Sequence, residues 1–359
     1  MTVAAGGVRD VHEAIRGGGA RVLPVAGGTK PALSGAPEGV VALDVSGLRG
    51  ILEHDPGELT FTALAGTPVA EVAAALAEHG QRLPFDPPLA DAGATLGGTV
   101  AAGVSGSGAF RHGGIRDFVI GVRFVDGTGT LVAGGGKVVK NAAGFDLPKL
   151  MAGSMGRLGV LVELSLKVFP APEATATFAF GFDDVGEALA AMARVARGPL
   201  GIEAIDLVPD ARLVVRLGGA AETLAARGAR LEALAGASAE RIDDDAALWR
   251  EAGALAWVPE DHVVVRAALT ARHVPAVREL LAAHDGHARY ANAANVAWIA
   301  WPAAAPLDAL DAGLTVLGLP AMAITGPPGR PLLGARPGGA FGQRIRAALD
   351  PHDRFPWEA

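Results

Sequence analysis

Short apolar runs separated by glycine- and proline-rich breaks extend along most of this chain, and their spacing predicts many short elements. In the first half, we expect strands over residues 22–25, 40–44, 50–54, 59–64, 119–125 and 160–169. Helical periodicity is clearest over residues 69–79, where Pro68 suits the first turn and Gly80 the end. A shorter amphipathic helix is expected over residues 8–16.

The pattern changes after a linker-like break at Ala171-Pro172-Glu173. Strands are then expected over residues 175–182, 203–208 and 212–217, with helices over 185–197 and 221–234. A second set has strands over 262–268, 296–301 and 321–324 and helices over 274–283 and 307–317, and a last helix is expected over 341–349. We interpret the two sets as one α+β domain, built from two ferredoxin-like halves around an antiparallel sheet.

Composition narrows the class of protein. Half of the 359 residues are hydrophobic, 19% are charged and the net charge is -7 without a basic tract, which argues against nucleic-acid binding. No apolar segment approaches the roughly 20 residues needed to span a bilayer, and charges interrupt what would be the core of an export signal. We therefore expect a cytoplasmic protein without a transmembrane segment.

The chain contains no cysteine. This excludes structural disulfides, thiolate zinc sites, cysteine-ligated iron–sulfur clusters and flavin attachment through cysteine. Any electron relay beyond a bound organic cofactor must lie on another chain or in a soluble acceptor.

Glycines gather in small clusters between residues 91 and 170, at 97–98, 113–114, 134–136 and 156/159. Only a residue without Cβ lets the backbone come close to a flat or anionic group, so these clusters indicate a cofactor, and a flavin dinucleotide is our hypothesis. An earlier stretch, Ala26-Gly27-Gly28-Thr29-Lys30, follows a predicted strand and suits an anion cradle made of backbone amides, a hydroxyl and an ammonium. It has neither Walker nor Rossmann spacing, and a tight turn after a strand is the alternative.

Four stretches together resemble the FAD-binding, PCMH-type (vanillyl-alcohol oxidase-like) flavoproteins. They are residues 24–30, 93–103 (GATLGGTVAAG), 116–121 with Asp126-Gly127, and 140–146 (KNAAGFD) with 153–161. Their order and spacing carry the resemblance, which covers about residues 20–172. Within the family the pattern is most similar to the FAD-binding subunits of bacterial glycolate oxidases.

The resemblance implies an α+β fold with a PCMH-type FAD-binding domain over residues 1–172, divided into subdomains of about 1–50 and 51–172. It further implies a cap domain over 173–330 and a C-terminal segment, 331–359, that returns to the FAD-binding domain. The resemblance assigns contacts with the FAD pyrophosphate to Ala26, Gly27, Gly28, Thr29, Lys30, Thr95, Leu96, Gly97 and Gly98. It assigns contacts with the flavin ring and the ribityl chain to Ala101, Gly103 and Gly106, and contacts with the adenine end to Gly159, Val160 and Leu161. Asp117, from the matched Arg-Asp motif, is also predicted to bind the cofactor.

The chain also departs from the pattern of the family that it resembles. Covalent members use a histidine or cysteine in these loops, and residues 24–30 contain neither, so we expect noncovalent FAD. His112 is the one histidine of the glycine-rich stretch; it could approach the flavin or be an exposed loop residue. The cap histidines show no metal-ligand spacing, and we predict no metal site.

Oxidation of an alcohol by a flavin needs a base or a positive charge to manage the proton and the carboxylate. Lys140 and Arg116 are the candidate catalytic residues. The alternative for Lys140 is an ion pair with an acid such as Asp146 that fixes the loop. The cap tryptophans are expected to be core rather than an electron path.

Three functions follow from the resemblance and its departures. The first is an FAD-binding subunit that works beside a catalytic flavin subunit and an iron–sulfur subunit in the oxidation of glycolate to glyoxylate, reaching the inner membrane only peripherally, through those partners. The second is a free-standing FAD oxidoreductase of a small alcohol or 2-hydroxy acid. The third is a flavin-fold scaffold without cofactor, against which the intact Gly27-Gly28 and Gly97-Gly98 pairs argue.

Overall fold

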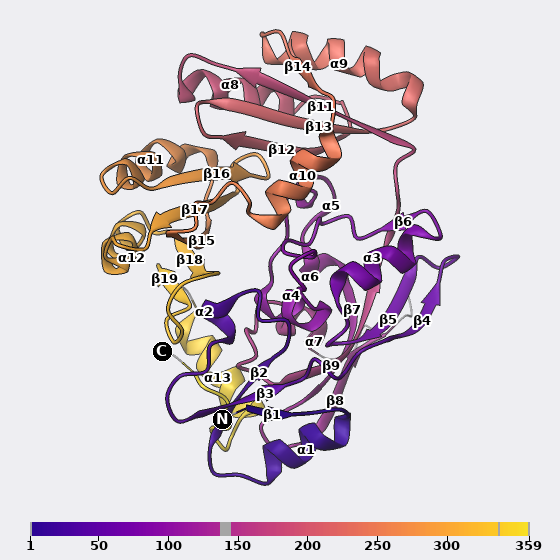
Figure 1. The fold of residues 1–359 in the computed structure, drawn as a ribbon, viewed down its shortest axis with the longest axis vertical. Helices are drawn as coiled ribbons and strands as arrows, with labels where there is room; N and C mark the ends of the chain where they lie inside the picture. The colour runs from indigo at the N-terminus through magenta and orange to yellow at the C-terminus, as the bar shows by residue number, and fades with distance from the viewer. Residues whose placement is uncertain (1, 137–144, 337, 358–359) are drawn as a thin grey trace.

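The computed structural model describes residues 2–136, 145–336 and 338–357. Figure 1 shows two bodies, with the first half of the chain below and the pink-to-orange segment above it. The fold class is α+β, as predicted. The C-terminal helix, drawn in yellow, lies beside the lower body.

The N-terminal unit is a three-stranded parallel sheet with the order β1-β3-β2. Parallel neighbours need crossover connections, and two helices supply them: in chain order the elements are β1 (Thr2–Ala4), α1 (Val8–Arg16), β2 (Arg21–Val25), α2 (Pro31–Ser34) and β3 (Val40–Asp44). The amphipathic α1 buries Val11 and Ile15 against this sheet, where Leu43 is fully buried. The free end of β2 leads directly into the glycine loop at residues 26–30.

The second unit is a five-stranded antiparallel sheet with the order β4-β5-β9-β7-β8. Its strands are β4 (Ile51–Asp55), β5 (Thr60–Leu64), β7 (Val119–Val125), β8 (Leu131–Gly135) and β9 (Val160–Lys167). Its helices are α3 (Val69–Ala77), α4 (Leu96–Ala102), α5 (Ala109–His112), α6 (Ile115–Phe118) and α7 (Leu147–Met151), and a small ladder joins β6 (Gln81–Arg82) to β10 (Phe169–Pro170). The helices and the sheet bury one apolar core that contains Phe61, Phe124 and Leu164.

The upper body is one nine-stranded antiparallel sheet with the order β14-β11-β13-β12-β16-β17-β15-β18-β19. Its first half has β11 (Ala174–Gly181), α8 (Val185–Ala196), β12 (Ile202–Val208), β13 (Arg212–Gly219), α9 (Ala221–Ala235) and β14 (Glu240–Ile242). After α10 (Asp245–Ala254), the second half has β15 (His262–Ala268), η1 (Ala271–His273), α11 (Val274–Ala282), β16 (His287–Ala291), β17 (Val296–Pro302), α12 (Leu307–Val316), β18 (Pro320–Ala323) and β19 (Leu332–Gly334).

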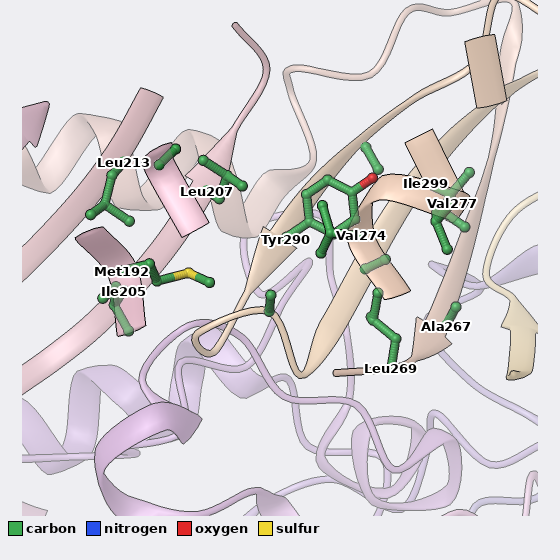
Figure 2. Close-up of a cluster of buried hydrophobic side chains, with 14 of the residues drawn as sticks. Met192, Ile205, Leu207, Leu213, Ala267, Leu269, Val274, Val277, Tyr290 and Ile299 are labelled. Carbon is green, nitrogen blue, oxygen red and sulfur yellow. The ribbon is translucent and has the colours of Figure 1, made fainter. Parts of the chain in front are cut away.

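Each half of this sheet places its first and third strands at the centre and its second and fourth outside. That is the ferredoxin-like arrangement predicted from the repeated element order. The halves meet at their second strands, β12 and β16, through a single ladder pairing of Leu207 with Tyr290. One hydrophobic cluster crosses this seam, and Figure 2 shows Leu207, Ile205 and Met192 on one side and Tyr290 with Val274 on the other.

The last segment leaves the upper body only after β19, which still pairs with β18. α13 (Gly339–Leu349) follows, and Ile345, Leu349 and Trp357 pack on the core of the five-stranded sheet. Phe355 is fully buried in the N-terminal unit. The return to the lower body therefore begins later than residue 331.

The two bodies are in direct contact. Backbone hydrogen bonds join Ala32 N–H to Ile324 C=O at 3.4 Å and Leu89 N–H to Gly253 C=O at 2.9 Å, and a shared apolar cluster contains Leu33 and Trp298. On this arrangement we keep a boundary near residue 172 as the proposed division into an FAD-binding half and a cap.

Candidate functional site

A cavity lies over the glycine loop that follows β2. It encloses about 710 Å³ of empty space, part of it open to solvent, within the range usual for ligand pockets. Its lining brings together the loop at 26–30, α4 and the start of β9, with further residues such as Leu33, Val45 and Ala65. Of the residues predicted to bind cofactor, those that line it are Ala26, Gly27, Gly28, Thr29, Lys30, Thr95, Gly97, Gly98, Ala101, Gly159 and Leu161.

The loop at 26–30 offers hydrogen-bond donors that the protein itself does not use. Among the described residues, the N–H groups of Gly27, Gly28, Thr29 and Lys30 donate no hydrogen bond to another protein group. Gly28 adopts φ +63°, which turns the loop back toward the cavity. Consecutive free amides in such a turn form a nest that suits an anion.

Lys30 adds a buried positive charge to this loop. Its residue is 6% exposed, and its Nζ donates to Thr29 Oγ1 at 3.2 Å. Across the described chain, no carboxylate forms a salt bridge with it, and burial lowers the pKa of Lys30 to about 8. A buried ammonium is costly unless a partner of opposite charge approaches, so this cavity favours an anionic ligand.

The glycines of the site serve two different purposes. A Cβ on Gly28 would meet no atom within 4 Å and would project into open space, so this position keeps room for a ligand. A Cβ on Gly27 would lie 2.1 Å from Gly93 O, and one on Gly97 would lie 2.7 Å from Ala65 Cβ. Gly27 and Gly97 are therefore required by the packing of the protein against itself.

The start of α4 has few free amides. Leu96 N–H donates to Thr67 O at 2.9 Å, and Gly97 N–H donates to Ala65 O at 2.7 Å. Gly98 N–H donates to the capping hydroxyl of Thr95 at 3.2 Å. These groups are already paired, so the loop at 26–30 is the better source of donors for a diphosphate.

Several of the residues predicted from the resemblance lie away from this cavity. Leu96 and Val160 are fully buried in apolar cores; β9 alternates its faces, so Leu161 and Gly159 face the cavity while Val160 points the other way. Asp117 Oδ2 accepts from Gly114 N–H at 3.0 Å and closes the turn before α6. Lys140 lies outside the described residues.

A second cavity lies between the lower body and the cap. Gly103, Ser105, Ala109, Phe110, Gly114, Ile115 and the predicted Arg116 line it from below, and Arg266, Asn292 and Asn295 line it from the cap. Gly106 lines neither of these cavities; it borders a third one beside Trp249, Trp257 and Trp298. Among the residues predicted to form one site, those that line a cavity are therefore divided among three different cavities.

Arg266 is the cap residue that sequence reasoning missed. It comes from β15, and its Nε is buried without a hydrogen-bond partner among the described residues. Burial lowers the pKa of its guanidinium. Asn292 Oδ1 is likewise buried and unpaired within the described chain. The one available signal was a single arginine within the apolar run His262-Val-Val-Val-Arg-Ala-Ala.

His112 takes neither position expected for it. Its side chain is 17% exposed and packs on Phe169, with ring centroids 5.0 Å apart. Its Nε2 lies 3.4 Å from Glu203 Oε2 of the cap. His112 lines neither the loop cavity nor the inter-body cavity and belongs to an inter-body ion cluster.

The tryptophans of the cap divide between core and cavity wall. Trp301 is fully buried and Trp298 is 5% exposed. Trp249 lies under the guanidinium groups of Arg216 and Arg289, at 4.9 and 5.4 Å from its ring. Among the described residues, no group of three or more His, Cys, Asp or Glu side chains is placed to hold a metal ion.

Comparison with known families identifies the lower body. The profile of an FAD binding domain matches residues 4–135. Residues 4–135 thus carry an FAD-binding domain. FAD is its cofactor. The free amides at 27–30 and the unpaired Lys30 fit the FAD diphosphate, since both supply donors or positive charge where a doubly negative group would lie.

The curated relatives to which the chain is similar include proteins named as oxidoreductases or oxidoreductase subunits. The chain is 40% identical over 205 residues to "Glycolate oxidase subunit GlcE" of Escherichia coli, an alignment that covers 57% of this chain and 58% of that protein. It is 32% identical over 215 residues to "D-2-hydroxyglutarate dehydrogenase" of Xanthomonas citri, covering 58% and 44%. With "Glycolate oxidase subunit GlcD" of Bacillus subtilis it shares 33% identity over 162 residues, covering 45% and 33%. The alignments thus span less than two thirds of each relative.

The whole fold has counterparts among solved structures. One structure of alkyldihydroxyacetonephosphate synthase covers 100% of this chain and 77% of its own, with a TM-score of 0.75 and 16% identity. A second structure of that enzyme covers 99% and 76%, with a TM-score of 0.70 and 15% identity. At these identities the likeness concerns the fold. Within the described chain, no helix is both long and apolar enough to cross a membrane.

Proposed function

We propose that this chain acts as an FAD-dependent oxidoreductase of a small 2-hydroxy acid, at the cavity between the FAD-binding half and the cap. The observation that carries the proposal is Arg266, whose guanidinium lines this cavity and has no acidic partner among the described residues. A planar guanidinium binds a carboxylate through two parallel hydrogen bonds. Relatives named as glycolate oxidase subunits and a 2-hydroxyglutarate dehydrogenase support the same class of substrate.

The residues of the cavity have distinct roles in this proposal. Arg266 binds the substrate carboxylate, and Asn292 Oδ1 accepts a hydrogen bond from the 2-hydroxyl. Bound FAD would supply the two-electron acceptor for oxidation of the 2-hydroxy acid to a 2-oxo acid, and the proton of the hydroxyl would pass to water. Arg116 adds a positive charge to the cavity from the FAD-binding half. Lys140 is the other predicted catalytic residue; it lies outside the described residues, and its role stays a proposal.

Anaerobic mixing with 2-hydroxy acids tests this function. The flavin absorbance near 450 nm should bleach with at least one of them. Arg266→Met should raise the concentration needed for half-maximal bleaching by about 10- to 100-fold, since a hydrogen bond to a charged group is worth about 1.5–3 kcal/mol. Arg266→Lys should lose less, and Arg272→Met, an exposed change in η1, should lose nothing. A flavin-loaded protein that bleaches with no 2-hydroxy acid contradicts the proposal.

We also propose that the chain works as one subunit of a larger glycolate-oxidising complex, beside a catalytic flavin subunit and an iron–sulfur subunit. Two observations favour this over a free-standing oxidoreductase. The chain lacks the cysteines that ligate an iron–sulfur cluster, so a one-electron relay would lie on a partner chain or in a soluble acceptor, and a relative is named as the GlcE subunit. For this complex we propose a cytoplasmic location, with attachment to the inner membrane through the partners.

Affinity purification from cells that co-express neighbouring flavin and iron–sulfur proteins tests the complex. Stoichiometric recovery of both, together with glycolate-dependent dye reduction by the complex that the isolated chain lacks, is the expected result. Full glycolate–dye reductase activity of the isolated chain would favour the free-standing alternative. A purified chain that stays colourless after reconstitution with FAD would favour a non-catalytic scaffold.

A further inference from the structure

We infer that the substrate of the inter-body cavity carries a second anionic group, and that Arg116 is the residue that selects it. This inference rests on the proposed function and deepens it, from a small 2-hydroxy acid in general to a 2-hydroxy dicarboxylic acid. It is carried by the placement of Arg116 and Arg266 around one space.

Arg116 enters the cavity from the FAD-binding half. It lies in α6, and its Nε donates to the backbone oxygen of Lys149 at 3.1 Å. This bond fixes the direction of the side chain while leaving the two terminal nitrogens available. Within the described part of the chain, no carboxylate lies within salt-bridge distance of Arg116, whereas the nearby Arg123 pairs with Glu163 at 3.0 Å.

Arg266 enters the same cavity from the cap, on β15. It too has no acidic partner in the described chain, and its Nε is buried. The remaining lining residues are neutral, with two asparagines, one serine and apolar or glycine positions. Arg266 is partly buried and Arg116 is exposed, but both line the same cavity. Two guanidiniums without counter-charges around one space repel each other, and a ligand with two negative charges would relieve that repulsion.

The number of negative charges on the ligand follows from this arrangement. A monocarboxylate such as glycolate would neutralise Arg266 and leave Arg116 without an anionic partner. A 2-hydroxy dicarboxylate would place the carboxylate beside its hydroxyl on Arg266 and Asn292, and its distal carboxylate on Arg116. Because one guanidinium comes from each body, such a ligand would also bridge the cap and the FAD-binding half.

Binding of unreactive acids tests the inference without relying on turnover. The flavin-loaded protein is titrated with acetate and propionate, and with succinate and glutarate, while flavin absorbance changes and the melting temperature are recorded. Succinate or glutarate should bind at least tenfold more tightly than the monocarboxylates. Arg116→Met should remove this preference, whereas Arg116→Lys should keep part of it.

Arg123→Met is the matched control, because it removes an arginine of the same body that is paired on the surface. It should leave the preference intact. Equal binding of mono- and dicarboxylates by the wild-type protein, or a preference that survives Arg116→Met, overturns the inference. So does a shift in sulfite affinity of the flavin in Arg116→Met without ligand, since Arg116 would then serve the cofactor and not the substrate.

The inference and the proposed function fail in different ways. If no 2-hydroxy acid bleaches the flavin, yet dicarboxylates bind through Arg116, the oxidation is wrong and the binding preference stands. If glycolate or lactate bleaches the flavin as efficiently as malate or 2-hydroxyglutarate, and Arg116→Met changes neither, the oxidation stands and the second anionic group is wrong.

Discussion

Arg111 of the FAD-binding half donates a hydrogen bond to Glu203 of the cap, with 2.7 Å between Nη1 and Oε1. Glu203 lies on β12, is 3% exposed, and also accepts from Arg82. His112 lies 3.4 Å from its second oxygen. One buried carboxylate of the cap thus gathers three basic side chains of the other body, and it is a principal electrostatic link between the two.

Removing the charge of Glu203 should weaken the contact between the two bodies and lower the stability of the protein. Glu203→Gln leaves Arg82 and Arg111 without their buried counter-charge, and breaking such a pair costs about 3 kcal/mol. We expect the free energy of unfolding, measured by urea titration, to fall by that order. Glu240→Gln is the control, because Glu240 pairs with Arg212 on the surface and is 69% exposed, where a loss of at most about 1 kcal/mol is expected. Equal losses for the two variants would contradict this role of Glu203.

The same cluster should make stability depend on acid. Burial alone would raise the pKa of Glu203, but Arg82, Arg111 and His112 hold it below the ordinary value of 4.5. The folded state therefore binds fewer protons than the unfolded state in this range, so the stability contributed by Glu203 is complete above pH 4.5 and is lost as the pH falls through its folded pKa. Urea titrations at several pH values should show the difference between wild type and Glu203→Gln shrinking below pH 4.5. A difference that stays constant down to pH 3 would contradict the assignment.

Lys30 should tie FAD affinity to pH. Burial lowers its pKa to about 8, and a diphosphate beside it would favour the charged form. Binding therefore takes up a proton once the pH exceeds about 8, and FAD affinity should fall as the pH rises above that value, by up to tenfold per unit. Equilibrium dialysis against FAD checks this. Lys30→Met should weaken binding about 10- to 100-fold and abolish the pH dependence, while Lys149→Met, which removes a half-exposed lysine outside the loop cavity, should alter neither.

A substitution at Gly28 should weaken FAD binding separately from its effect on the stability of the fold. Gly28→Ala places a Cβ at φ +63° in open space of the cavity, at a backbone cost of about 1–2 kcal/mol. Gly80 offers a matched control, since its φ is +64° and a Cβ there also meets no atom within 4 Å. Both variants should lose similar stability in the cofactor-free protein, but only Gly28→Ala should also lose at least tenfold in FAD affinity. Equal FAD affinities for the two variants would remove the diphosphate from this loop.

The sequence predicted elements best where local patterning decides the structure. The apolar runs at 119–125 and 262–268 are strands at those bounds. β16 was missed because His-Ala-Arg-Tyr-Ala has little apolar character of its own; its neighbour β17 and the seam with β12 determine it. Such long-range pairing leaves no local signal.

The site divides in the same way. The loop at 26–30 could be found from its glycines and Lys30, because its function depends on the local backbone. Arg266 could not, since it reaches the cavity only when segments about 150 residues apart in the chain come together. The resemblance also assigned whole stretches to the cofactor, whereas in β9 alternate residues face opposite sides, which separates Val160 from Gly159 and Leu161.

Tyr290 is the single tyrosine of the chain and lies at the seam between the two halves of the cap. Its ring belongs to the hydrophobic cluster that also contains Val274, Ile299 and Leu207, drawn in Figure 2, and its residue is 1% exposed. The hydroxyl has no hydrogen-bond partner among the described residues, and burial raises the pKa of this phenol.

Tyr290→Phe keeps the ring and removes the unpaired hydroxyl, so it should not destabilise the protein and should raise the free energy of unfolding by about 1 kcal/mol. Tyr290→Ala instead removes the ring from the seam and should cost about 3–5 kcal/mol. Urea denaturation of the two variants checks both values. A loss of more than 1 kcal/mol in Tyr290→Phe would show that the hydroxyl is hydrogen-bonded in solution, and would contradict this prediction.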